Sequence, residues 1–109
     1  MPELKESTTA VLIRGQGVNN GYTTEPYEVG WATEALFFIL TMKNFVKGII
    51  HAQFSPDGIN WADTELKMEL PPTGNVSFIR ISHFGNWLRF KIEIPEDSTV
   101  KLMGTLHLK

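Results

Sequence analysis

The chain has 109 residues, the usual size of one domain, and that length supports a single hydrophobic core. Hydrophobic residues make up 42% and charged residues 20%, which excludes an intrinsically disordered chain. The net charge of -2 argues against binding to nucleic-acid backbones, and the lack of cysteine excludes disulfide frameworks and thiolate metal sites. We therefore expect one domain over residues 1–109, with the polar residues 1–6 as a mobile arm.

Apolar residues recur at every second position along most of the chain, which is typical of β-strands. In chain order, the expected strands cover residues 8–14, 22–29, 35–42, 48–54, 61–65, 67–70, 76–82, 87–94 and 100–109. Residues 15–21, rich in glycine and asparagine, are expected to form a loop. About eight short strands with frequent turns predict an all-β fold, a two-sheet antiparallel sandwich of the jelly-roll type.

The last two expected strands show the alternation most clearly. Neither keeps the period of about 3.6 residues that an amphipathic helix would require. The predicted core consists of Ile50, Phe54, Leu88, Phe90, Ile92, Leu102 and Leu106. Because residues 95–98 have the composition of a turn, we expect segments 87–94 and 100–109 to pair as a hairpin.

Residues 55–61, Ser-Pro-Asp-Gly-Ile-Asn-Trp, form the most specific local motif. Pro56 fixes φ for the second position of a turn, Asp57 suits the third, and Gly58 accepts positive φ. Trp61 then begins the returning strand. The motif predicts a structural hairpin turn, and a ligand contact through Asp57 and Trp61 is the alternative.

Residues that could carry chemistry do not form a recognisable catalytic or metal motif. His51, His83 and His107 lack metal-ligand spacing, and no serine occupies a nucleophile elbow. Oxygen donors suited to calcium occur at Asp57, Asn60 and Asp63, without the spacing of a calcium loop. We expect no enzyme activity, no cofactor and no metal.

The order of these segments resembles two kinds of β-sandwich protein. The hairpin over 55–61 is similar to those of discoidin-like carbohydrate- or lipid-binding modules. A fuller resemblance covers residues 27–108, about three quarters of the chain, and includes the apolar strand 35–42, the hairpin and segment 84–92. That order resembles small jelly-roll-like proteins of tailed-phage virions, which decorate or cement capsids or form tail parts. The short length and the lack of cysteine favour the virion type.

A surplus of apolar residues gives the strongest indication of function. Segment 35–42 is apolar on both faces, and other large apolar side chains fall at positions that should face outward. Exposed apolar surface of this kind usually marks a protein interface. The candidate interface residues are Trp31, Phe38, Ile49, Trp87 and Met103.

These observations predict a non-enzymatic structural protein that self-associates and attaches to a larger protein shell or tail. The resemblance implies a homotrimer, located in the virion or in the host cytoplasm during assembly. The sequence shows no apolar run of membrane-spanning length and no secretory signal, so neither membrane nor nucleic acid is expected as a partner.

A carbohydrate-binding module is the alternative. Its stacking platform would come from Tyr22, Tyr27, Trp31, Trp61 or Trp87, beside Asn19, Asn20 and Asn60. A coplanar row of exposed aromatic rings would favour this function. Aromatic rings at a contact between subunits would favour assembly.

Overall fold

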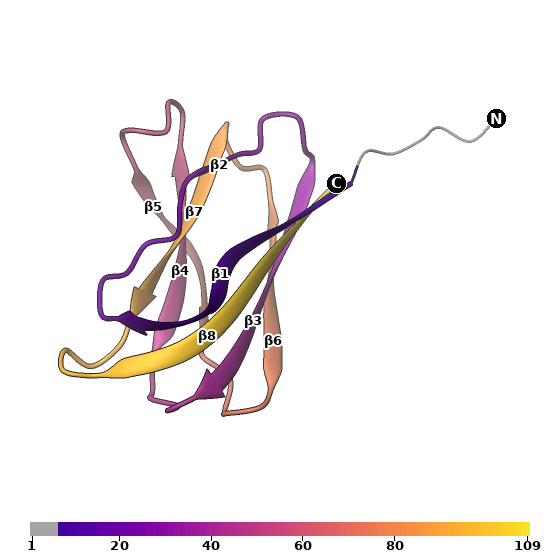
Figure 1. Ribbon diagram of the computed structural model, residues 1–109. Helices are drawn as coiled ribbons and strands as arrows, with labels where there is room; N and C mark the ends of the chain where they lie inside the picture. The colour runs from indigo at the N-terminus through magenta and orange to yellow at the C-terminus, as the bar shows by residue number, and fades with distance from the viewer. Residues whose placement is uncertain (1–6) are drawn as a thin grey trace.

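The computed structural model describes residues 7–109, which form eight strands in two antiparallel sheets (Figure 1). The strands are β1 (Thr8–Asn19), β2 (Tyr27–Glu28), β3 (Glu34–Lys43), β4 (Ile49–Ser55), β5 (Ala62–Glu69), β6 (Val76–Ser82), β7 (Trp87–Glu93) and β8 (Thr99–Leu108). One sheet has the order β1-β8-β3-β6 and the other β2-β7-β4-β5. The predicted all-β two-sheet sandwich is therefore confirmed. The predicted N-terminal arm lies outside the described residues.

The core lies between the two sheets and is built from their alternating inward side chains. Phe37 of β3 and Phe90 of β7 stack across it, with ring centroids 3.9 Å apart and planes at 8°. The predicted core members that are fully buried are Ile50, Leu88, Phe90, Ile92, Leu102 and Leu106. Phe54 is only half-buried, because it lies at the end of β4, edge-on to Phe84. No helix in residues 7–109 is long and apolar enough to span a membrane.

The expected hairpin of segments 87–94 and 100–109 is wrong. β7 pairs with β4 and β2, whereas β8 pairs with β1 and β3 in the opposite sheet. The turn after β7 therefore crosses between sheets. Both strands satisfy the same alternation, since each has one face on the shared core, and the alternation does not reveal which sheet a strand joins.

Three strand boundaries also differ from the expected ones. β1 continues through the glycine-rich segment and stays paired with β8, with a register shift between Arg14 and Gln16 and a φ of 65° at Gly15. In segment 22–29, only β2 and an isolated bridge between Thr23 and Lys91 are formed. Segments 61–65 and 67–70 belong to one strand, β5.

Candidate functional sites on the two sheet faces

The outer face of the β1-β8-β3-β6 sheet has an apolar region centred on β3. Because β3 directs Phe37 and Ile39 into the core, its intervening side chains point away from it. They meet outward side chains of β6 and β8 at matching register positions. Together these side chains form what we call the apolar face: Leu36, Phe38, Leu40, Met42, Val76, Phe78 and Met103.

Aromatic contacts tie the centre of the apolar face together. Phe38 lies opposite Phe78 across the β3–β6 pair, with ring centroids 5.5 Å apart. On its other side, Phe38 meets the ring of His107 edge-on at 5.0 Å. Phe78 is 52% exposed and Val76 is 58% exposed. The apolar face is thus an ordered surface that the described part of the chain leaves in contact with water.

Charged side chains lie at the two ends of the apolar face. Glu34, Arg80 and Lys109 line a hollow of about 280 Å³ at one end. Lys43 and Lys101 oppose each other at the other end. An apolar centre with charged groups at its border is the usual anatomy of a protein–protein interface.

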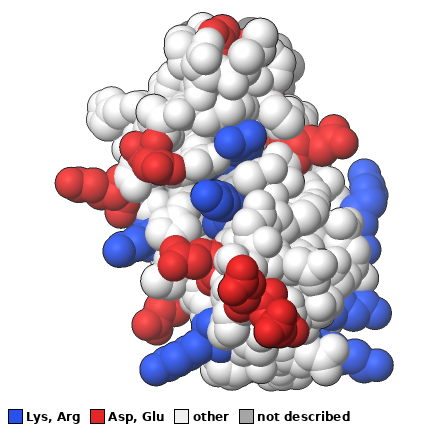
Figure 2. All heavy atoms as spheres, turned by 90° about the vertical axis from the view of Figure 1, so that its left-hand side faces the viewer, with Lys and Arg blue, Asp and Glu red and all other residues white. Residues whose placement is uncertain are grey.

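The outer face of the opposite sheet is polar, and Figure 2 shows side chains of both charges scattered over it. Arg89 donates from Nε to Gln53 Oε1 at 2.7 Å, and Gln53 Nε2 donates to Asp63 Oδ1 at 2.7 Å. The Arg89 guanidinium also lies 4.3 Å from the centre of the Trp61 ring. These contacts join β4, β5 and β7 in one polar network.

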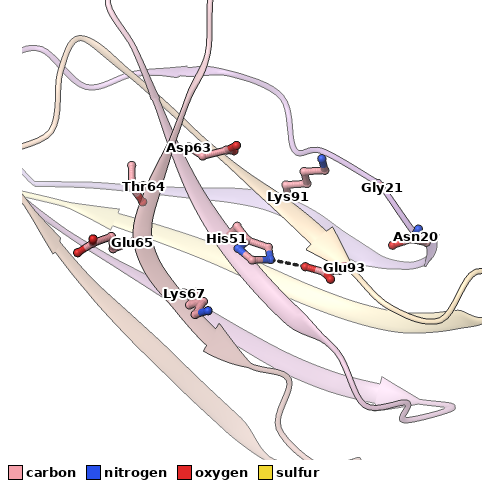
Figure 3. Close-up of a pocket in the computed structure, with 9 residues that line it drawn as sticks. All are labelled: Asn20, Gly21, His51, Asp63, Thr64, Glu65, Lys67, Lys91 and Glu93. Atoms are coloured by element: carbon pink, nitrogen blue, oxygen red, sulfur yellow. Dashed lines mark hydrogen bonds and ion pairs between the residues drawn. The ribbon is translucent and has the colours of Figure 1, made fainter.

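A polar hollow of about 640 Å³ lies on this face (Figure 3). Its lining residues are Asn20, Gly21, His51, Asp63, Thr64, Glu65, Lys67, Lys91 and Glu93. His51 Nε2 lies 2.6 Å from Glu93 Oε1, and the backbone register places His51 between Lys67 and Lys91. Within residues 7–109, no group of three metal-ligating side chains converges. Of the described residues that line this hollow, His51 alone has an aromatic ring.

The structure separates the predicted interface residues. Phe38 and Met103 lie on the apolar face, and Trp31 is 41% exposed in the connection between β2 and β3. Ile49 and Trp87 belong to the other sheet, at opposite ends of the β4–β7 pair. Their role as one interface stays a prediction. The sequence reasoning missed Val76 and Phe78, although the alternation within 76–82 is the signal that could have found them.

The turn over 55–61 is closed by its own polar groups. Gly58 has a φ of 80°, which confirms the expected positive φ, and Trp87 packs against this glycine. Gly58 N donates to Ser55 Oγ at 2.8 Å, while Asn60 N and Ile59 N donate to Asp57 Oδ1 at 2.8 and 2.9 Å. The hydrogen bonds that Asp57 accepts hold its pKa well below the usual value, and the bond from the Asn60 backbone has the largest effect.

The oxygen donors considered for calcium do not form a site. Asp57 accepts hydrogen bonds within its own turn, including one from Asn60 Nδ2 at 2.7 Å. Asp63 accepts from Gln53 on the adjacent strand. The carboxylates therefore serve two separate hydrogen-bond networks.

The aromatic residues of the carbohydrate alternative do not form an exposed row. Trp31 is exposed, but Trp61 is half-buried beneath Arg89. Tyr22 and Tyr27 pack against the core. The nearby asparagines have structural partners: Asn19 Oδ1 accepts from Thr99 Oγ1 at 2.6 Å, and Asn20 Oδ1 accepts from Ile94 N at 3.1 Å.

Comparison with known proteins adds evidence on the fold. No protein-family model matches the sequence, and no curated protein matches it. The structure is similar to that of the SPBc2 prophage-derived protein YomS, with a TM-score of 0.61 and 13% identity over 98% of this chain and 99% of that chain. A chain from Bacillus endospore appendages, described as a novel family of disulfide-linked pili, gives a TM-score of 0.48 and 9% identity over 95% of this chain and 85% of that chain. At 13% identity, the likeness to YomS shows that this chain shares that protein's fold from end to end.

Proposed function

We propose that this protein is a structural assembly protein without catalytic activity, which associates with copies of itself and attaches to a larger protein assembly. The observation that carries the proposal is the apolar face. Seven apolar side chains on three adjacent strands form one surface, and their charged neighbours lie at its ends. Water contact with such a surface is unfavourable by roughly 25 cal/mol per Å², so covering it drives association.

The setting that fits this function is a phage virion. The similar fold of a prophage-derived protein supports a phage origin, and the sequence resembles small jelly-roll-like virion proteins. A homotrimer attached to a capsid or tail surface is the arrangement that this resemblance implies. The chemistry of the apolar face supports self-association independently of the trimer.

The polar hollow is less suited than the apolar face to be a contact between subunits. Its central histidine is already paired with Glu93, and the lysines beside it lie among carboxylates. A carbohydrate site would need an exposed aromatic platform, and the hollow has none among its lining residues. We therefore assign assembly to the apolar face.

The test is the mass of the full chain in solution across a range of concentrations, measured by light scattering. We expect an oligomer whose dissociation constant rises about 30-fold or more in Phe38→Ser, because this change removes the central ring of the apolar face. The control is Ile59→Ser, at an 80% exposed position in the turn between β4 and β5, which should associate like the wild type. Circular dichroism checks that both variants fold. A wild-type chain that stays monomeric at high concentration would contradict the proposal.

A further inference from the structure

The four edges of the two sheets differ in how well they are protected against pairing with another strand. An edge strand has a row of unpaired backbone N–H and C=O groups, and native proteins usually block it with bulges, charges or very short strands. Here the edge strands are β1 and β6 in one sheet and β2 and β5 in the other.

Three of the edges carry such protection. β1 has two register shifts against β8, one between Val11 and Ile13 and one between Arg14 and Gln16, which distort the strand. β2 is only two residues long. β5 has a register shift against β4 and an outward row of charged side chains: Asp63, Glu65, Lys67 and Glu69.

The remaining edge, β6, has neither a register shift nor a row of charged side chains, and it is seven residues long. It pairs with β3 residue for residue from Val76 to Ser82, without a register shift. The strand contains no proline and one charged residue, Arg80. Its outward positions include Val76 and Phe78, both more than half exposed. β6 is thus a regular, seven-residue strand with its free backbone edge beside the apolar face.

We propose that β6 pairs with β6 of a second copy of this chain, antiparallel, about a two-fold axis at Ile79. This inference rests on the proposed self-association and gives one contact of the oligomer a two-fold geometry, which differs from the three-fold arrangement of a homotrimer. An identical strand is the natural occupant, because antiparallel pairing about a two-fold axis makes the edge complementary to itself. The two four-stranded sheets then join into one continuous sheet of eight strands.

The side chains of β6 suit this register. Pairing about Ile79 gives every residue from 76 to 82 a partner and keeps outward residues opposite outward residues. Phe78 then faces Arg80 of the second copy, which allows a cation–π contact and separates the two arginines. Ile79 meets its own copy on the inward side, which joins the two cores. The apolar face of one copy continues directly into that of the other.

Cysteine pairing tests the register directly, because the chain has no cysteine of its own. The register places Val76 opposite Ser82 of the second copy, with Cα atoms about 4.5–5.5 Å apart, within disulfide range. We expect an equal mixture of Val76→Cys and Ser82→Cys chains to form disulfide-linked dimers at least about tenfold faster than either variant alone. In either variant alone, the two thiols would lie on the order of 20 Å apart.

The matched control uses the protected edge of the other sheet. Asp63→Cys and Glu69→Cys lie six residues apart on β5, as positions 76 and 82 do on β6, and their mixture should give no preferential linking. Light scattering on the wild type separates the two hypotheses. An oligomer that shows no preferential 76–82 linking overturns the β6 pairing and leaves self-association standing. A chain that remains monomeric overturns both.

Discussion

Gly104 shows how a single missing side chain shapes the core. It lies buried within β8, and a Cβ atom there would come within 2.8 Å of Phe37 Cζ. Because Phe37 is held against Phe90, its ring has little room to move. We expect Gly104→Ala to lower the free energy of unfolding by about 1–3 kcal/mol, measured by urea denaturation. In a Phe37→Leu background the cost should shrink, and an equal cost in both backgrounds would contradict the contact.

Thr41 is a buried residue whose hydroxyl has no partner within the described chain. An unsatisfied buried hydroxyl is unfavourable, and valine has nearly the same shape without the polar atom. We expect Thr41→Val to raise the free energy of unfolding by about 1 kcal/mol, seen as a higher melting temperature. The matched control is Thr24→Val: the Thr24 hydroxyl is also buried but accepts from Phe90 N at 2.9 Å, so this change should destabilise. Stabilisation by both changes would contradict the argument.

Asp57 predicts a pH dependence of stability. Its pKa is lowered by hydrogen bonds that exist only in the folded turn, so ionisation of this group favours the folded state. That contribution is complete above the ordinary aspartate pKa of about 3.9 and is lost as the pH falls below it. Thermal unfolding between about pH 6 and pH 2 should therefore show a steeper acid loss for the wild type than for Asp57→Asn. Parallel profiles for Asp57→Asn and wild type would refute the assignment.

At the scale of the strands, much of the fold could be predicted from local patterns. The period-two alternation located the core-facing side chains of β7 and β8, and the turn chemistry at Gly58 located the β4–β5 hairpin. The sheet that each strand joins could not be predicted, because β7 and β8 have equivalent apolar faces and their pairing partners are distant in sequence. The extension of β1 was missed because glycine indicates a loop, whereas here Gly15, with a φ of 65°, accommodates a bulge within the strand.

The apolar face could likewise be predicted only in part from the sequence. The double-sided apolar pattern of segment 35–42 matches the apolar outward side of β3, and Phe38 and Met103 lie on that face. The contribution of β6 could not be seen, because Val76 and Phe78 become part of the surface only through their register with β3. The unprotected edge is likewise a property of strand order, which no local motif encodes.

At the scale of the whole molecule, the two outer faces are chemically opposite. Within residues 7–109, the outer face of one sheet has an uncovered apolar region, and that of the other carries charges of both signs, a histidine–glutamate contact and an arginine stacked on tryptophan. A sandwich built in this way can cover its apolar side with other subunits while its polar side faces water. Pairing through β6 would place the apolar sides of two copies next to each other on one surface.

The contrast between the two outer faces predicts how association responds to salt. Interfaces formed by apolar side chains are little affected by ionic screening, whereas those formed by opposite charges weaken strongly. Raising sodium chloride from about 0.05 M to about 0.5 M should change the dissociation constant of the oligomer by less than about threefold, and sodium sulfate should tighten it. Sedimentation velocity measures both effects. Lys91→Glu, which reverses a charge on the polar face, should leave association unchanged. A loss of affinity of about tenfold or more in salt, or on this substitution, would place the interface on the polar face instead.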